Sequence, residues 1–121
     1  ALSSAASDVY KRQVAGDNDP DMLVAIDALE ECGGGYVAVS GGKVLARLAL
    51  PVAGLMSDAP LAAIIARQQE LLSAAAQLGV SGASDPFITL SFLALPVIPD
   101  VRLTDLGVFD VNRMQFIHRP A

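Results

Sequence analysis

Residues 50–58 read Leu50-Pro-Val-Ala-Gly-Leu-Met-Ser-Asp58, and this stretch divides the sequence into its two main parts. Its proline and glycine make it a poor helix, because proline removes a backbone donor and glycine is conformationally loose. Its four large apolar side chains make it a poor solvent-exposed loop. We therefore expect the segment to be a buried connector that packs into a closed cavity or against another protein surface.

Upstream of this connector, the sequence predicts a helix followed by a β-hairpin. Asn18-Asp-Pro-Asp21 supplies a capping side chain, a proline for the first turn and acidic residues where the helix dipole is positive. Gly33-Gly-Gly35 ends this helix, since glycine tolerates the left-handed C-terminal cap. Two β-prone runs, 36–39 and 43–50, then flank Ser40-Gly-Gly42, which is typical of a hairpin turn.

Downstream of the connector, the sequence predicts a second helix. Ser57 or Asp58 is expected to cap it, with Pro60 in its first turn and Gly79 at its end. Apolar positions recur at helical spacing and should form the buried stripe: Leu61, Ile64, Ile65, Leu71, Leu72, Ala75 and Leu78.

The rest of the chain predicts strands. Residues 87–95 alternate apolar and polar side chains in their first half, as a strand does. Short strands are predicted at 101–103 and 108–111, and an edge strand within 112–118. Together these elements predict an α+β fold, a mainly antiparallel sheet with two principal helices packed on it.

Composition restricts the function classes. A chain of 121 residues allows one domain, and a net charge of −5 without a Lys/Arg cluster argues against a nucleic-acid or anionic-membrane surface. The single Cys32 excludes an internal disulfide framework and fits a reducing, cytoplasmic compartment. We expect Cys32 to be a small buried hydrophobe and the single histidine, His118, to lie at an edge. One histidine and one cysteine cannot furnish a zinc site or a catalytic set, so no catalytic residue and no metal ligand is predicted.

High hydropathy points to a missing partner. Hydrophobic residues make up 53% of the chain and its mean hydropathy is +0.49, yet no run reaches the roughly 18 apolar residues of a membrane span. We therefore expect part of the surface to face another domain.

The end of the connector holds the candidate binding residues. Leu55, Met56, Ser57 and Asp58 place apolar side chains, a hydroxyl and a carboxylate at a predicted helix N-terminus, after a loop too apolar to be free. The alternative is structural: Ser57 and Asp58 cap the helix, and Met56 fills a gap in the core.

The first residues have a different origin in our interpretation. Ser3-Ser-Ala-Ala-Ser-Asp-Val-Tyr-Lys-Arg-Gln13 can be written, codon for codon, as a transposase-based sequencing adapter that ends in its mosaic end. A natural Ser/Ala-rich leader is the alternative. We predict that residues 1–13 are a non-native, disordered leader, and that 14–121 are the native domain, truncated upstream by accident.

Several motifs run in order through the native part of the chain: Val14-Ala-Gly-Asp-Asn-Asp-Pro-Asp-Met22, Gly33-Gly-Gly35, Gly42-Lys-Val44, the connector 50–58, and Pro86-Phe-Ile-Thr-Leu-Ser-Phe-Leu-Ala-Leu-Pro-Val-Ile-Pro-Asp100 with Arg102-Leu-Thr-Asp105 and Gly107. With these motifs the chain resembles the C-terminal domain of microbial adenine deaminases, which belong to the amidohydrolase superfamily. The resemblance covers nearly all of 14–116 and excludes the leader.

The resemblance implies a parent enzyme that hydrolyses adenine to hypoxanthine and ammonia. In that family an iron, manganese or zinc ion activates the hydroxide in a (β/α)₈ barrel. The metal-binding residues of the barrel lie upstream of this domain, so the resemblance implies no catalytic residue and no bound cofactor here.

The implied partner is that barrel, in the same polypeptide. We expect residues 50–58, together with 96–100, to pack near its active-site mouth, where 55–58 would help to shape the purine pocket. The alternative is a stand-alone, non-catalytic binding or oligomerisation module that forms a homo-oligomer through the same apolar loops.

Overall fold

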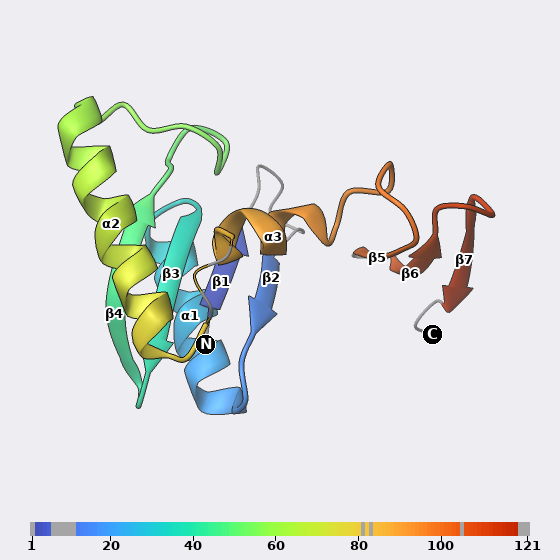
Figure 1. Cartoon of the computed structure of the whole chain (residues 1–121), viewed down its shortest axis with the longest axis horizontal. Helices are drawn as coiled ribbons and strands as arrows, with labels where there is room; N and C mark the ends of the chain where they lie inside the picture. Colours follow the sequence, from blue (N-terminus) through green and yellow to red (C-terminus); the bar gives the residue numbers. More distant parts are fainter. Residues whose placement is uncertain (1, 6–11, 81, 83, 105, 119–121) are drawn as a thin grey trace.

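The computed structural model describes residues 2–5, 12–80, 82, 84–104 and 106–118. Its elements are, in chain order, β1 (Leu2–Ala5), β2 (Arg12–Ala15), α1 (Asp19–Glu31), β3 (Gly35–Ser40), β4 (Lys43–Ala49), α2 (Leu61–Gln77), α3 (Pro86–Phe92), β5 (Val101–Thr104), β6 (Gly107–Asp110) and β7 (Gln115–His118). Figure 1 shows them along the chain.

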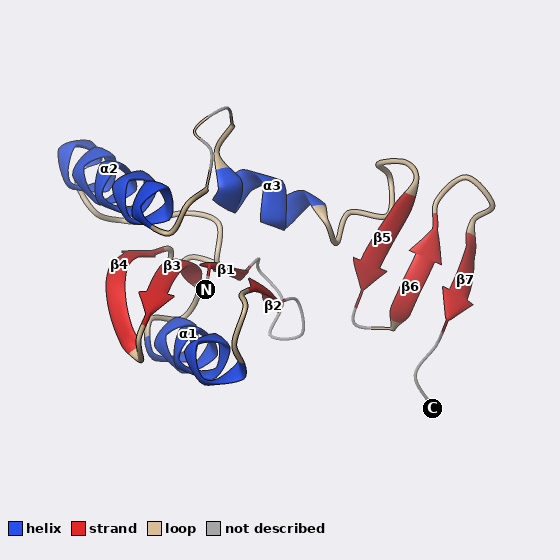
Figure 2. Ribbon diagram, turned by 60° about the horizontal axis from the view of Figure 1, so that its bottom comes forward, coloured by secondary structure: helices blue, strands red, loops and turns tan. Residues whose placement is uncertain are grey.

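The strands form two antiparallel sheets. The larger sheet has the order β2-β1-β3-β4, and the smaller has the order β5-β6-β7. Helix α1 covers one face of the larger sheet, while α2 and α3 cover the other (Figure 2). The predicted α+β class is confirmed, as are the three C-terminal strands, although these strands form a sheet of their own.

Strand β3 explains why the larger sheet needs helices on both faces. Val37 and Val39 are fully buried in a cluster with Ala25 and Leu29 of α1. Ala38 points the opposite way and joins the cluster formed with α2 and α3. Because alternate residues of a strand point to opposite faces, the apolar run in β3 has two cores to fill.

The predicted start of the first helix and the hairpin are confirmed. Asn18 is the N-cap of α1, where its side-chain oxygen accepts a hydrogen bond from the Asp21 backbone N–H at 2.9 Å. Gly41 and Gly42 join β3 to β4 with φ values of 58° and 72°. Positive φ at both central residues is what the two-residue hairpin turn requires.

The predicted glycine stop of the first helix is also confirmed. The Gly34 N–H donates to the Leu29 carbonyl at 3.1 Å and the Gly33 N–H donates to the Glu30 carbonyl at 3.3 Å. This pair of bonds is a Schellman motif, which satisfies carbonyls that the last helical turn leaves free.

The prediction of a strand at 87–95 is wrong, because Pro86–Phe92 is the helix α3. The Asp85 carboxylate caps it by accepting from the Phe87 and Ile88 N–H groups at 2.9 and 3.3 Å. Phe87 and Leu90 are buried, which is helical spacing. An aspartate followed by a proline is typical of a helix start, but the short alternation of apolar and polar residues after it favoured a strand.

The prediction that Ser57 or Asp58 caps the second helix is also wrong. Helix α2 begins at Leu61, and its N-cap, Pro60, makes no side-chain capping bond. The Ser57 hydroxyl instead accepts from the Ala59 N–H at 3.2 Å, which is a local turn.

The predicted apolar stripe of α2 divides between two faces of the helix. Leu71 and Ala75 are buried against the sheet. Leu61, Ile65 and Leu72, which recur at intervals of four and seven residues, are exposed.

Part of the predicted leader 1–13 belongs to strands in the described structure. Leu2–Ala5 forms β1, which pairs with β2 on one side and β3 on the other, and both α1 and α3 contact it. Residues 6–11 lie outside the described part of the chain. Strand pairing depends on the backbone, so it leaves the predicted adapter origin of these residues as a prediction.

Candidate functional site

The connector 50–58 folds as a tight turn between β4 and α2. The Val52 N–H donates to the Met56 carbonyl at 3.0 Å, and the Met56 N–H donates to the Val52 carbonyl at 3.1 Å. Ala53 and Gly54 lie inside this closure with φ values of 58° and 70°. The turn is therefore fixed by its own backbone hydrogen bonds rather than by apolar burial.

The loop that follows α1 anchors the base of this turn. The Leu50 N–H donates to the Gly34 carbonyl at 2.9 Å, and Leu50 is buried. A Cβ atom added at Gly34 would lie 2.9 Å from the Cα of Gly54, so the two backbones meet where only glycine fits. The anchored base holds the tip of the turn in a defined place.

The tip of the turn is exposed. Leu55 and Met56 each expose 60% of their surface. Leu50 is buried within this chain as expected, whereas the tip does not pack into a closed cavity of this chain, so its burial against another protein surface stays a prediction. Met56 does not fill a gap in the core, so the structural alternative for this residue is wrong.

Ser57 and Asp58 line a groove of about 700 Å³. Arg47 of β4 and Arg67 of α2 enter the same groove, together with Glu31 from the end of α1. The structure thus brings two of the four predicted residues to one groove. Leu55 and Met56 do not line it.

The charges of this groove are already paired or balanced. Arg47 forms an ion pair with Glu31 at 3.4 Å, and Arg67 forms one with Glu70 at 2.7 Å. Both pairs are exposed, so each contributes little to stability. Among the residues that line the groove, Glu31 and Asp58 balance Arg47 and Arg67, so the lining has no excess charge that would select an anion or a cation.

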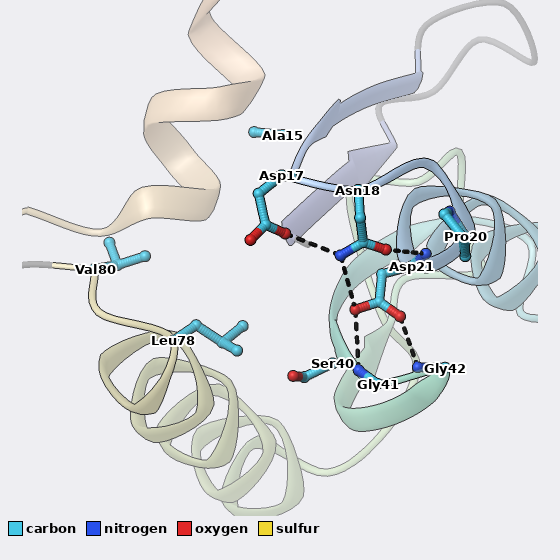
Figure 3. A pocket seen from close by; sticks show the side chains of 11 residues that line it. Ala15, Asp17, Asn18, Pro20, Asp21, Ser40, Gly41, Gly42, Leu78 and Val80 are labelled. Atoms are coloured by element: carbon cyan, nitrogen blue, oxygen red, sulfur yellow. Dashed lines mark hydrogen bonds between the residues drawn. The ribbon is translucent and has the colours of Figure 1, made fainter.

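A second cavity, of about 740 Å³, lies where α1 begins and the β3–β4 turn ends (Figure 3). Its buried polar residue is Asp21, whose carboxylate accepts from the Gly42 N–H at 2.6 Å, the Gly41 N–H at 3.0 Å and the Asn18 side-chain amide at 3.3 Å. These bonds, that from Gly42 above all, hold the pKa of Asp21 below its usual range although burial opposes them.

Asp21 was predicted only as an acidic residue at a helix start. The structure gives it a further role, because its carboxylate joins α1 to a hairpin turn some 20 residues away in the sequence. The sequence contains both halves of this contact. One is an acidic residue in the first turn of a predicted helix, and the other is a Gly-Gly turn whose two N–H groups can donate to it. All three hydrogen bonds that the Asp21 carboxylate accepts are internal to the fold, so the geometry indicates a structural role.

The remaining predicted residues are not part of either cavity. Cys32 is half-buried, packs against the α1 cluster and donates its S–H to the Gly34 carbonyl at 3.3 Å. His118 is the last residue of the edge strand β7, and its side chain lies outside the described part of the structure.

The described residues do not fit a metal ion. Within them, no three His, Cys, Asp or Glu side chains come together as a metal site requires. Nor, in the same part of the chain, is any helix long and apolar enough to span a membrane.

Comparison with known proteins identifies the family. A family model described as the adenine deaminase C-terminal domain matches residues 1–115, a range that includes the predicted leader. The adenine deaminase of Nitratidesulfovibrio vulgaris strain Hildenborough is 52% identical over 115 residues, which are 94% of this chain and 20% of the relative.

Two further relatives agree. The adenine deaminase of Bacillus licheniformis is 48% identical over 110 residues, covering 91% of this chain and 19% of the relative. That of Leuconostoc mesenteroides is 47% identical over 115 residues, covering 95% and 20%. The chain spans about one fifth of the length of these curated relatives. It belongs to the adenine deaminase C-terminal domain family.

Proposed function

We propose that this domain serves an adenine deaminase, an enzyme that converts adenine and water to hypoxanthine and ammonia, by packing on a catalytic domain that precedes it in the parent polypeptide. The observation that carries the proposal is the exposed, anchored turn at 50–58. Leu55 and Met56 are 60% exposed, although the backbone that holds them is fixed. A fixed apolar tip is typical of a docking element, because ordering it costs little when a partner binds.

The relatives support the same proposal. About four-fifths of the length of each relative lies outside the matched segment, which leaves room for a catalytic domain. The described residues of this chain do not fit a metal, so we assign any iron, manganese or zinc to that preceding domain, of the amidohydrolase barrel type. A cytoplasmic location belongs to the proposal and is supported by the single cysteine.

Within this proposal the two halves of the turn have different roles. Leu55 and Met56 contact the rim of the catalytic domain and exclude water from its active-site mouth. Ser57 and Asp58 lie in the groove beside them and offer polar contacts at the edge of the purine pocket. Residues 96–100 form a further contact with the same domain.

A chimera tests the proposal. In the Nitratidesulfovibrio vulgaris relative, the matching segment is replaced by this chain, and adenine deamination is measured at steady state. We expect an active chimera whose kcat/KM falls roughly 5- to 30-fold with Met56→Ser, the scale of a buried interface side chain of 1–2 kcal/mol. Leu23→Ser is the matched control, since Leu23 is 62% exposed on α1, which covers the other face of the sheet.

Two results would contradict the proposal. One is an inactive chimera beside an active relative. The other is the same kcat/KM for Met56→Ser and Leu23→Ser. If instead light scattering shows that the 121-residue chain self-associates, and Met56→Ser abolishes the association, the stand-alone oligomerisation module is the better interpretation.

A further inference from the structure

The sheet β5–β7 extends away from the rest of the domain (Figure 1). Its strands have their main contacts with one another, and residues 93–100 connect it to α3. One backbone hydrogen bond, from the Leu103 N–H to the Leu93 carbonyl at 3.0 Å, ties it to the end of that helix. Among the described elements, no helix covers either face of this sheet (Figure 2).

One face of this sheet is partly closed by its own side chains. Arg102, Phe109 and Phe116 lie in register across the three strands. The two phenylalanine rings meet edge to face with their centroids 5.1 Å apart. All three residues are half-buried, so this face has a small apolar centre of its own.

The opposite face carries apolar side chains that nothing in the described chain covers. Val101 and Leu103 alternate with Arg102 along β5, and Leu103 pairs with Val108 of β6. Ile117 lies at the bulge of β7, between Phe116, which pairs with Phe109, and His118, which pairs with Val108. Leu103 and Ile117 are 57% and 60% exposed. A small three-stranded sheet depends on the burial of its apolar side chains for stability, so a partner that covers this face would stabilise the sheet.

We infer that this second face of β5–β7 docks on an apolar surface of the domain that precedes this one in the parent polypeptide. The inference rests on the proposed function and extends it, because it adds a contact with the same domain that is separate from those of residues 50–58 and 96–100. The length of the relatives indicates which partner covers this face. The matched segment is about one fifth of each relative, so most of the parent polypeptide remains available to cover the face. Since that partner is in the same chain, its effective concentration is high and a modest apolar patch is enough.

Hydrogen–deuterium exchange tests the inference. The exchange of β5 and β7 backbone amides is compared between the isolated 121-residue chain and the chimera with the Nitratidesulfovibrio vulgaris relative. We expect exchange at least 10-fold slower in the chimera, because docking closes the small sheet. The double variant Leu103→Ser with Ile117→Ser should restore the fast exchange, whereas Leu23→Ser, of similar exposure, should leave it slow.

Exchange in β3 and β4 reports whether the body of the domain stays folded in each variant. Equal exchange of β5–β7 in the isolated chain and the chimera would overturn the inference. So would slow exchange in a self-associated form of the isolated chain, because a second copy would then cover the face. Deaminase activity separates the two proposals: an active chimera with a fast-exchanging β5–β7 sheet refutes this inference alone, and an inactive chimera with a slow-exchanging one refutes only the proposed activity.

Discussion

The helical assignment of residues 86–92 predicts a specific pattern of stability losses. Phe87 is 2% exposed, is the largest fully buried side chain and contacts the Tyr36 ring at a centroid distance of 5.6 Å. Truncating such a residue costs about 3–5 kcal/mol, because transfer free energy is lost and a cavity remains. Leu90→Ala should cost about 2–4 kcal/mol for the same reason. Thr89 is exposed, so Thr89→Ala should change the stability by less than about 0.5 kcal/mol.

The assay is urea unfolding of the 121-residue chain, followed by far-UV circular dichroism. With a slope of about 2 kcal/mol per molar urea, Phe87→Ala should lower the midpoint by about 2 M. Phe87→Leu keeps most of the volume and should cost roughly 1 kcal/mol. A helix buries positions 87 and 90, whereas a strand would bury 87 and 89. Equal losses for Leu90→Ala and Thr89→Ala would therefore refute the reasoning.

The remaining predictions concern Asp21 and two glycines. Because hydrogen bonds lower the folded pKa of Asp21, its contribution is present above the unfolded pKa of about 3.9 and is lost as the pH falls through the folded value. Asp21→Asn should thus lower the melting temperature at pH 6 more than in acid, and parallel melting curves across pH would contradict this. Gly35→Ala should cost on the order of 4 kcal/mol in urea unfolding, since its Cβ would lie 2.0 Å from the Leu48 carbonyl oxygen. Gly41→Ala meets nothing within 4 Å and should cost only the left-handed strain of about 1–2 kcal/mol, so equal losses for the two glycines would be inconsistent with the geometry.

The sequence predicted correctly those elements that are determined by residues close together in the chain. Asn18 caps α1 through a bond to a residue three positions away, and the Gly41–Gly42 turn needs only its own backbone. Helix α3 was missed because seven residues give too little periodicity to separate a helix from a strand, even though the Asp85 cap was legible.

The site depended on distant parts of the chain, which the sequence pattern does not bring together. The groove joins Ser57 to Arg47 and Arg67, each on a different element. Asp21 reaches Gly42 across 21 positions of sequence. The family could be predicted from the sequence alone. Several motifs in a fixed order over most of the chain are specific to a family even when their individual residues have no catalytic chemistry.

Strand β1 lies in the interior of the larger sheet although it comes first in the chain. Removing β1 would not simply remove an edge strand. It would divide the sheet in two, leaving β2 without a neighbouring strand and the β3–β4 hairpin with a new open edge. Two rows of unpaired backbone groups would then face solvent, which is how sheets recruit foreign strands. A variant of this chain that lacks residues 2–5 should therefore aggregate more than one that lacks residues 115–118, because removing β7 from an outer edge adds no further row of unpaired backbone groups.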